Sequence, residues 1–159
     1  MDADDDRAAP HASDRRTGGP DAGWHEQRRQ AVAGHAAALD AARAAEAGRA
    51  AELLAGFVRR AAEAGLPPGP LRAVSFDGRS TYRTSLRGWY LKANRSVAVG
   101  EDGQYYVLNV PSSLRARFSG ADVQPSTPRL VVGAGGGDGE TIPLADLLDR
   151  RLTAGVVWP

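Results

Sequence analysis

The stretch SVAVGEDGQYYVLNV, residues 96–110, decides the fold, because two runs of strand-forming residues flank the pair Asp102-Gly103. Glycine readily adopts the positive φ that a tight turn requires, so Asp-Gly between apolar runs predicts a β-hairpin. The same pair recurs at Asp77-Gly78 and Asp138-Gly139, again between segments rich in Val, Leu, Phe, Tyr or Ile. Residues 66–159 are therefore expected to form a small antiparallel β-meander domain.

The meander is expected to contain about five to seven strands. The apolar runs that predict them lie at 71–76, 80–86, 88–93, 96–100, 104–110, 129–133 and 140–142. After Pro111, residues 112–120 are interpreted as one irregular helical turn capped by Ser112 or Ser113. A short amphipathic C-terminal helix should follow Pro143, with its apolar face formed by Leu144, Leu147, Leu148 and Leu152. Gly155 should end this helix, and Trp158 should pack back onto the sheet.

A long helix is predicted upstream of the meander, over residues 21–65. The segment is dense in Ala, Arg and Glu and contains no proline, which favours helix over its whole length. Gly48 is an alternative point at which it could break, because glycine weakens a helix interior. Residues 1–20 carry almost no large apolar side chains and are interpreted as a disordered acidic tail. The fold class is thus α+β.

The glycine-rich stretch RLVVGAGGGDGETIPL, residues 129–144, has the outline of a phosphate-binding loop. A dinucleotide fingerprint would require glycine where this chain has Asp138. A P-loop would require a lysine after the glycines, and no lysine follows anywhere in the chain. The stretch is better interpreted as a long hairpin turn, and no cofactor is predicted.

Several kinds of chemistry are excluded by composition. The chain has no cysteine, and residues 66–159 have no histidine. Thiolate nucleophiles, disulfides, Ser-His-Asp triads and ordinary zinc sites are therefore not expected in the β domain. His25 and His35 lie ten residues apart, on different faces of the predicted helix. We predict no catalytic or metal-binding residues, and a protein that is not an enzyme.

Charge and hydropathy bear on the expected location and partners. The chain carries 20 basic and 19 acidic side chains, so no global field drives it toward nucleic acid or membranes. Its acidic start, MDADDDRAAP, lacks the pattern of a secretory signal. No apolar run reaches the roughly 18–20 residues of a membrane span. A cytoplasmic protein without a membrane partner is expected.

The first function hypothesis is a non-catalytic protein-interaction or regulatory module that self-associates through the long helix. Val32, Leu39 and Leu53 follow a seven-residue rhythm, with Phe57 at an intervening position, which is typical of a coiled-coil seam. The alternative is that only Leu53 and the residues after it pack, against the protein's own sheet. The sequence leaves both interpretations open.

The second hypothesis is binding of nucleic acid or another polyanion by residues 79–95. This region interleaves aromatic side chains with five basic ones and no acid; the candidate binding residues are Arg79, Arg83, Arg87, Trp89, Lys92 and Arg95. If residues 79–89 form one unbroken strand, strand alternation places on one face Arg79, Arg83, Arg87 and Trp89. A basic sheet face with aromatic side chains often binds single-stranded nucleic acid. The alternatives are a solvated face whose Trp89 covers the core, or a surface for an acidic partner.

Overall fold

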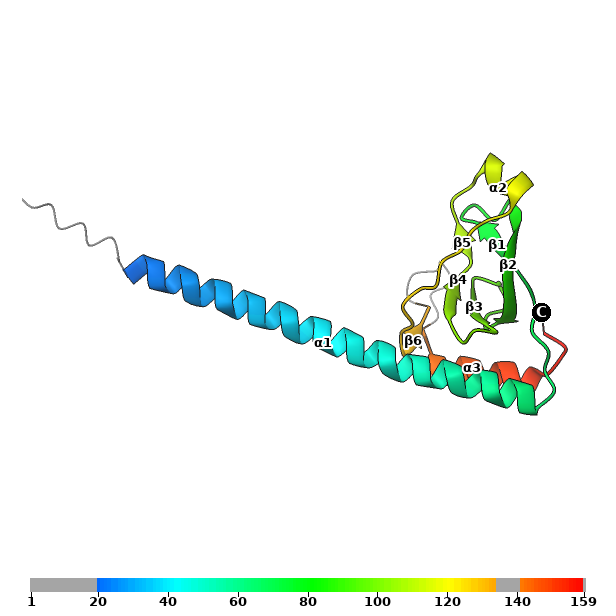
Figure 1. Ribbon diagram of the computed structural model, residues 1–159, viewed down its shortest axis with the longest axis horizontal. Coiled ribbons are helices and arrows are strands. Elements are labelled where there is room, and N and C mark those ends of the chain that lie inside the picture. The colour runs from blue at the N-terminus through cyan, green and yellow to red at the C-terminus, as the bar shows by residue number, and fades with distance from the viewer. Residues whose placement is uncertain (1–19, 134–140, 159) are drawn as a thin grey trace, which may run out of the picture. The chain divides into compact units, whose positions relative to one another are not determined.

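The computed structural model describes residues 20–133 and 141–158 of the chain. It divides between Asp40 and Ala41 into two compact units. Helix α1, Pro20–Glu63, is continuous through Gly48, which confirms the long helix and excludes the alternative of a break at that glycine. The structure is α+β, with a long N-terminal helix, an antiparallel-rich sheet and a short C-terminal helix (Figure 1). The predicted disordered tail lies outside the described residues, apart from Pro20.

Four consecutive strands form the predicted meander. Each pairs antiparallel with the next: β1 Gly69–Ser75, β2 Thr81–Tyr90, β3 Val97–Gly100 and β4 Tyr105–Val107. The predicted strands at 80–86 and 88–93 form the single strand β2. Gly78 and Gly103 adopt φ values of 70° and 76°, so both Asp-Gly turns use the positive φ on which the prediction rested.

A fifth strand closes the sheet through a parallel pairing that the meander prediction did not include, although its residues belong to the strand predicted at 104–110. Strand β5, Asn109–Val110, pairs in parallel with β1 at the opposite edge from β4. Only Leu108 separates β4 from β5, and its N–H donates to the Ser96 carbonyl (2.8 Å) while its own carbonyl accepts from Val74 (2.8 Å). Residues 105–110 therefore join both edges and make a small barrel. A parallel pairing has no local turn signal, so the sequence did not reveal it.

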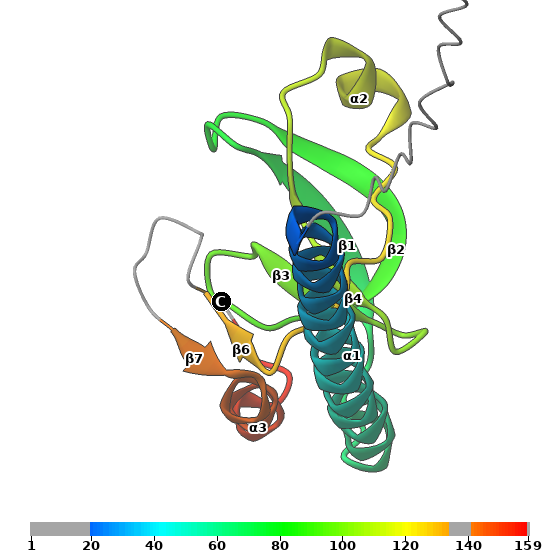
Figure 2. The ribbon, with the colours of Figure 1, turned by 90° about the vertical axis from the view of Figure 1, so that its left-hand side faces the viewer.

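The two strands on either side of the glycine-rich stretch form a separate two-stranded sheet. Strand β6, Val131–Val132, pairs antiparallel with β7, Ile142–Pro143, so the predicted hairpin is present, although Asp138-Gly139 lies outside the described residues. Pro143 is the last residue of β7, one position before the helix it was expected to begin. Helix α3, Leu144–Ala154, follows directly (Figure 2).

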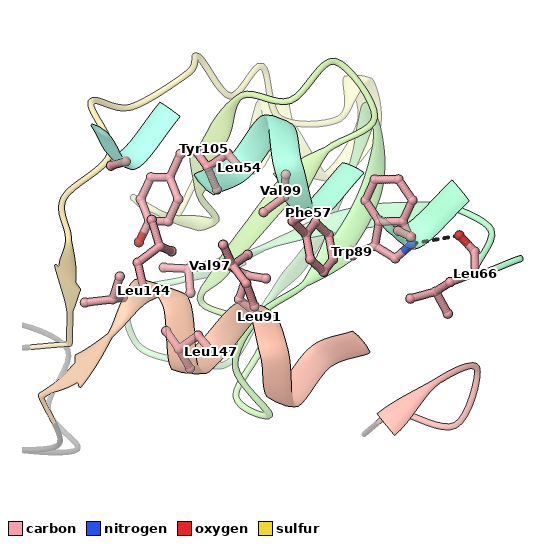
Figure 3. Close-up of a cluster of buried hydrophobic side chains, with 14 residues drawn as sticks. Leu54, Phe57, Leu66, Trp89, Leu91, Val97, Val99, Tyr105, Leu144 and Leu147 are labelled. Atoms are coloured by element: carbon pink, nitrogen blue, oxygen red, sulfur yellow. Dashed lines mark hydrogen bonds between the residues drawn. The ribbon is translucent and has the colours of Figure 1, made fainter. Parts of the chain in front are cut away.

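The inner and outer surfaces of the barrel have separate apolar cores. The inner core is formed by Leu71, Ala98, Tyr106 and Leu108. The outer core lies where α1 and α3 cover the outer side of β2, β3 and β4, and Phe57 contacts Trp89 edge to face there (Figure 3). These helices leave the outer side of β1 and the first half of β2 uncovered, because Pro70, Arg72, Arg83 and Arg87 are exposed.

Helix α3 buries the predicted leucine face. Trp158, which follows the helix in the chain, packs against it. Leu144, Leu147 and Leu148 are buried and Leu152 is half-buried. Trp158 lies over the buried guanidinium of Arg151, 5.3 Å from the ring centroid. Trp158 thus packs on helix α3, a contact that the sequence did not predict, and the expectation that it packs on the sheet stays a prediction. Burial lowers the pKa of Arg151.

Two buried tyrosines are expected to lower the free energy of unfolding of the barrel at alkaline pH. Burial raises the pKa of Tyr105 and of Tyr106 from 10.0 to about 12, and the hydrogen bond from Tyr106 to Asp102 (2.7 Å) adds to the second shift. The folded state therefore holds these protons more tightly than the unfolded chain. We expect the free energy of unfolding to be unaffected by these groups below pH 10 and to fall as the pH rises toward 12. Urea unfolding across this range checks it, and a Tyr105→Phe/Tyr106→Phe variant should show a shallower decline.

Candidate functional site

Strand β2 carries a bulge at the centre of the uncovered barrel wall. Residues 84–86 of β2 together oppose the single residue Leu71 of β1, because the pairing shifts there. Thr84 Oγ1 donates to the Leu71 carbonyl (2.7 Å) and accepts from the Leu86 N–H (3.2 Å). The threonine hydroxyl thus replaces the ladder hydrogen bonds that the extra residues interrupt. A bulge bends a strand and increases its twist, as a small closed barrel requires.

Two arginines lie side by side next to this bulge. Arg72 of β1 is the direct cross-strand partner of Arg83 of β2, so both side chains point to the outer side of the barrel. Both residues are exposed, and within the described residues no carboxylate pairs with either side chain. Like charges directly opposite one another disfavour the sheet. The wall therefore holds a concentration of positive charge that the described part of the protein does not neutralise.

The other predicted basic residues are separated by the fold. Arg87 Nη2 donates to the Pro68 carbonyl (2.8 Å) and its Nε lies 3.7 Å from Glu101 Oε2. Arg79 lies in the turn before β2. Lys92 and Arg95 lie in the turn after β2, where the Arg95 guanidinium sits over Tyr90, 5.6 Å from the ring centroid. The six candidate residues thus do not form one continuous face.

Trp89 is not on the basic surface. It is 4% exposed, its Nε1 donates to the Leu66 carbonyl (3.2 Å), and its ring packs edge to face on Phe57 at 5.5 Å (Figure 3). Its side chain points outward from β2 as predicted, but α1 and α3 cover that end of the strand. The prediction that Trp89 lies open beside Arg83 and Arg87 is therefore wrong, and the alternative, that it covers the core, is correct.

A cleft of about 740 Å³ opens between the bulge and helix α2, Leu114–Ser119. Arg83 and Arg115 both line it, together with the hydroxyl-bearing residues Thr84, Ser85, Ser113 and Ser119. The one acidic residue in its lining is Asp122, whose carboxylate accepts from the Gln124 side-chain amide (3.1 Å). The cleft therefore combines two cations, one anion and several hydroxyls. Sequence reasoning missed it because its two walls are separated by about thirty residues of chain.

Helix α2 is held at both ends while its apolar side chains face solvent. The Ser113 hydroxyl caps it by accepting from the Ala116 N–H (3.2 Å), as predicted, and the Ser113 N–H donates to the Tyr82 hydroxyl (3.0 Å). After the helix, the Ala121 N–H donates to the Arg83 carbonyl (2.7 Å). The helix has no buried residue, and Phe118 is 84% exposed. Leu114, one turn earlier, is 76% exposed, so this anchored helix places two neighbouring apolar side chains in solvent.

The predicted helical seam is divided between surface and core. Val32 and Leu39 are 64% and 45% exposed, and Leu53 is partly exposed at 37%. Phe57 is 1% exposed and belongs to the outer core. The prediction that all four form one self-association seam is therefore wrong for Phe57, because its apolar surface is already used against Trp89. The open part of the seam lies within residues 23–40, where every side chain is exposed.

Comparisons with protein-family models, with curated protein sequences and with solved structures found no match. Within residues 20–133 and 141–158, no group of three or more His, Cys, Asp or Glu side chains could hold a metal ion. None of the helices in the described part of the chain has the length and apolar character needed to cross a membrane.

Proposed function

We propose that this chain is a non-catalytic interaction module that self-associates through helical residues 23–40. The observation that carries the proposal is the exposure of every side chain in this segment, including Val32 and Leu39. Together with Ala36 they occupy positions i, i+4 and i+7, which lie on one side of a helix. A single helix cannot bury such a stripe by itself, whereas a second copy of the same helix can.

The composition of the stripe fits close packing of two helices. Fully burying a Val or Leu side chain contributes about 1.5–3 kcal/mol relative to leaving it in water. Gly34 has nothing within 4 Å of the position of a Cβ atom, and alanines occupy most of the neighbouring positions. Small side chains bury little area themselves but let two backbones approach, so Val32 and Leu39 supply most of the contact. The expected association is consequently modest and dependent on concentration.

Sedimentation equilibrium of the full chain tests the proposal. We expect a mass of about twice the 16.7 kDa of one chain, or more, at high concentration. A Val32→Glu/Leu39→Glu variant should sediment as a monomer. The matched control is Gln30→Glu/Ala37→Glu, which adds two negative charges at the same spacing on the far side of the helix, at exposed positions. A monomeric unaltered chain, or equal dissociation in the control, would contradict the proposal.

A further inference from the structure

We propose that the cleft between the β2 bulge and α2 binds single-stranded nucleic acid. In this proposal Arg72, Arg83 and Arg115 contact backbone phosphates, and a base stacks on Phe118. The site lies on the β domain, so the inference is independent of self-association through residues 23–40. The proposed site includes Arg83 of the predicted polyanion surface. Its stacking residue is Phe118, which is open to solvent, and not the buried Trp89.

The part of the chain that holds the three arginines has an excess of positive charge. Residues 66–122 contain eight basic and four acidic side chains, a net charge of 8 − 4 = +4. Each of the four acids has a partner: Asp77 accepts from Ser75, Glu101 lies near Arg87, Asp102 accepts from Tyr106, and Asp122 accepts from Gln124. Three of these partners are uncharged, and the one ion pair among them uses Arg87, so no carboxylate among the described residues forms an ion pair with Arg72 or Arg83. A phosphate between them would replace a repulsion with two charge-assisted hydrogen bonds.

The arginines are arranged along a path from the barrel wall into the cleft. Arg83 lies on the barrel wall and also lines the cleft, with Arg115 on the facing helix. Successive phosphates of one strand can therefore pass from the Arg72–Arg83 pair into the cleft. Its volume, about 740 Å³, is within the range of cavities that hold small ligands, about 300–1,000 Å³. The Ser85 side chain is exposed in the same lining and adds a hydroxyl donor.

Exposed apolar side chains lie on α2 within one turn of Arg115, at the border of the cleft and outside its lining. Leu114 and Phe118 lie one turn apart on α2 and are 76% and 84% exposed. Phe76 is also exposed, and its N–H donates to the carbonyl of Val110, which lines the cleft (3.0 Å). Arginines next to open aromatic rings are the combination that holds unstacked bases and their phosphates. A duplex keeps its bases stacked on one another, so this arrangement favours a single strand.

Fluorescence anisotropy with a labelled single-stranded oligonucleotide of mixed sequence tests the proposal on the full chain. We expect binding that weakens steeply between about 50 and about 200 mM salt. An Arg83→Gln/Arg115→Gln variant should bind about tenfold more weakly or worse, with a log–log salt slope reduced by about two. The Phe118→Ala variant should lose about fivefold or more without losing stability, because that side chain is exposed.

The control variant is Arg49→Gln/Arg59→Gln, which removes the same charge from exposed positions on α1 and should bind like the unaltered chain. Circular dichroism confirms that each variant is folded. Absence of binding at low salt, or equal losses in the control variant, would overturn the proposal. Tighter binding of a poly-aspartate peptide, or of vesicles containing phosphatidylserine, through the same arginines would also overturn it and would assign the cleft to that partner.

Discussion

The Phe57→Ala variant is expected to lose about 3–5 kcal/mol of its free energy of unfolding. Phe57 is 1% exposed and lies in the outer core between α1 and the barrel. Its ring packs edge to face on Trp89 (Figure 3). Truncation would remove buried apolar area and leave a cavity, because neighbouring backbone elements cannot close fully around it. We therefore expect this helix–barrel contact to be a principal source of the stability of the β domain.

Urea unfolding at low chain concentration measures this loss without a contribution from association. The control is Leu53→Ala, one turn earlier on the same helix, where the side chain is 37% exposed. We expect that variant to lose about 1 kcal/mol or less. Equal losses at the two positions would contradict the assignment of Phe57 to the core and Leu53 to the surface.

The Gly88→Ala variant is expected to lose about 3 kcal/mol or to fail to fold. A Cβ atom at Gly88 would collide with the Val99 carbonyl oxygen and would lie 2.8 Å from the Gly100 Cα atom. Both obstacles are backbone atoms of β3, so no side-chain rotation can relieve the clash. Gly88 is paired with Gly100, and the two strands approach closely there. The substitution would separate β2 from β3 where β2 leaves the bulge.

The control for Gly88→Ala is Gly69→Ala. Gly69 is the cross-strand partner of Gly88 on β1, but it has nothing within 4 Å of its Cβ position. We expect the Gly69→Ala variant to change the free energy of unfolding by about 0.5 kcal/mol or less. Both variants can be compared by thermal unfolding followed by circular dichroism. A well-folded Gly88→Ala protein with unchanged stability would contradict the close strand approach.

Local sequence signals predicted most of the fold. Alanine-rich composition predicted the long helix, and the pairs Asp77-Gly78 and Asp102-Gly103 predicted two hairpins. Both turns have the expected positive φ at glycine. The barrel closure at Leu108 was not predictable in the same way. It depends on a parallel contact between β1 and β5, whose pairing is set by the curvature of the whole sheet. The Thr84 bulge supplies part of that curvature, and no turn residue marks it.

The candidate sites were only partly predictable for a related reason. Strand alternation placed Arg83, Arg87 and Trp89 on one side of β2, but it could not show where the covering helices end. The structure covers Trp89 and leaves the arginines open. Arg72 was absent from the prediction because it becomes important only through its register with Arg83. Phe118 could have been noticed because it follows Arg115 and Arg117 directly within the short helical segment predicted at residues 112–120.

Reaction of an introduced thiol tests the proposed self-association most directly, because the chain has no cysteine of its own. Ala36→Cys places a thiol within the stripe of Val32 and Leu39, and Ala38→Cys places one on the opposite side of the helix. We expect the Ala36→Cys thiol to react much more slowly with a soluble thiol reagent at high than at low chain concentration. The Ala38→Cys thiol should react at the same rate throughout. Equal reaction rates at both positions and at all concentrations would contradict association through this stripe.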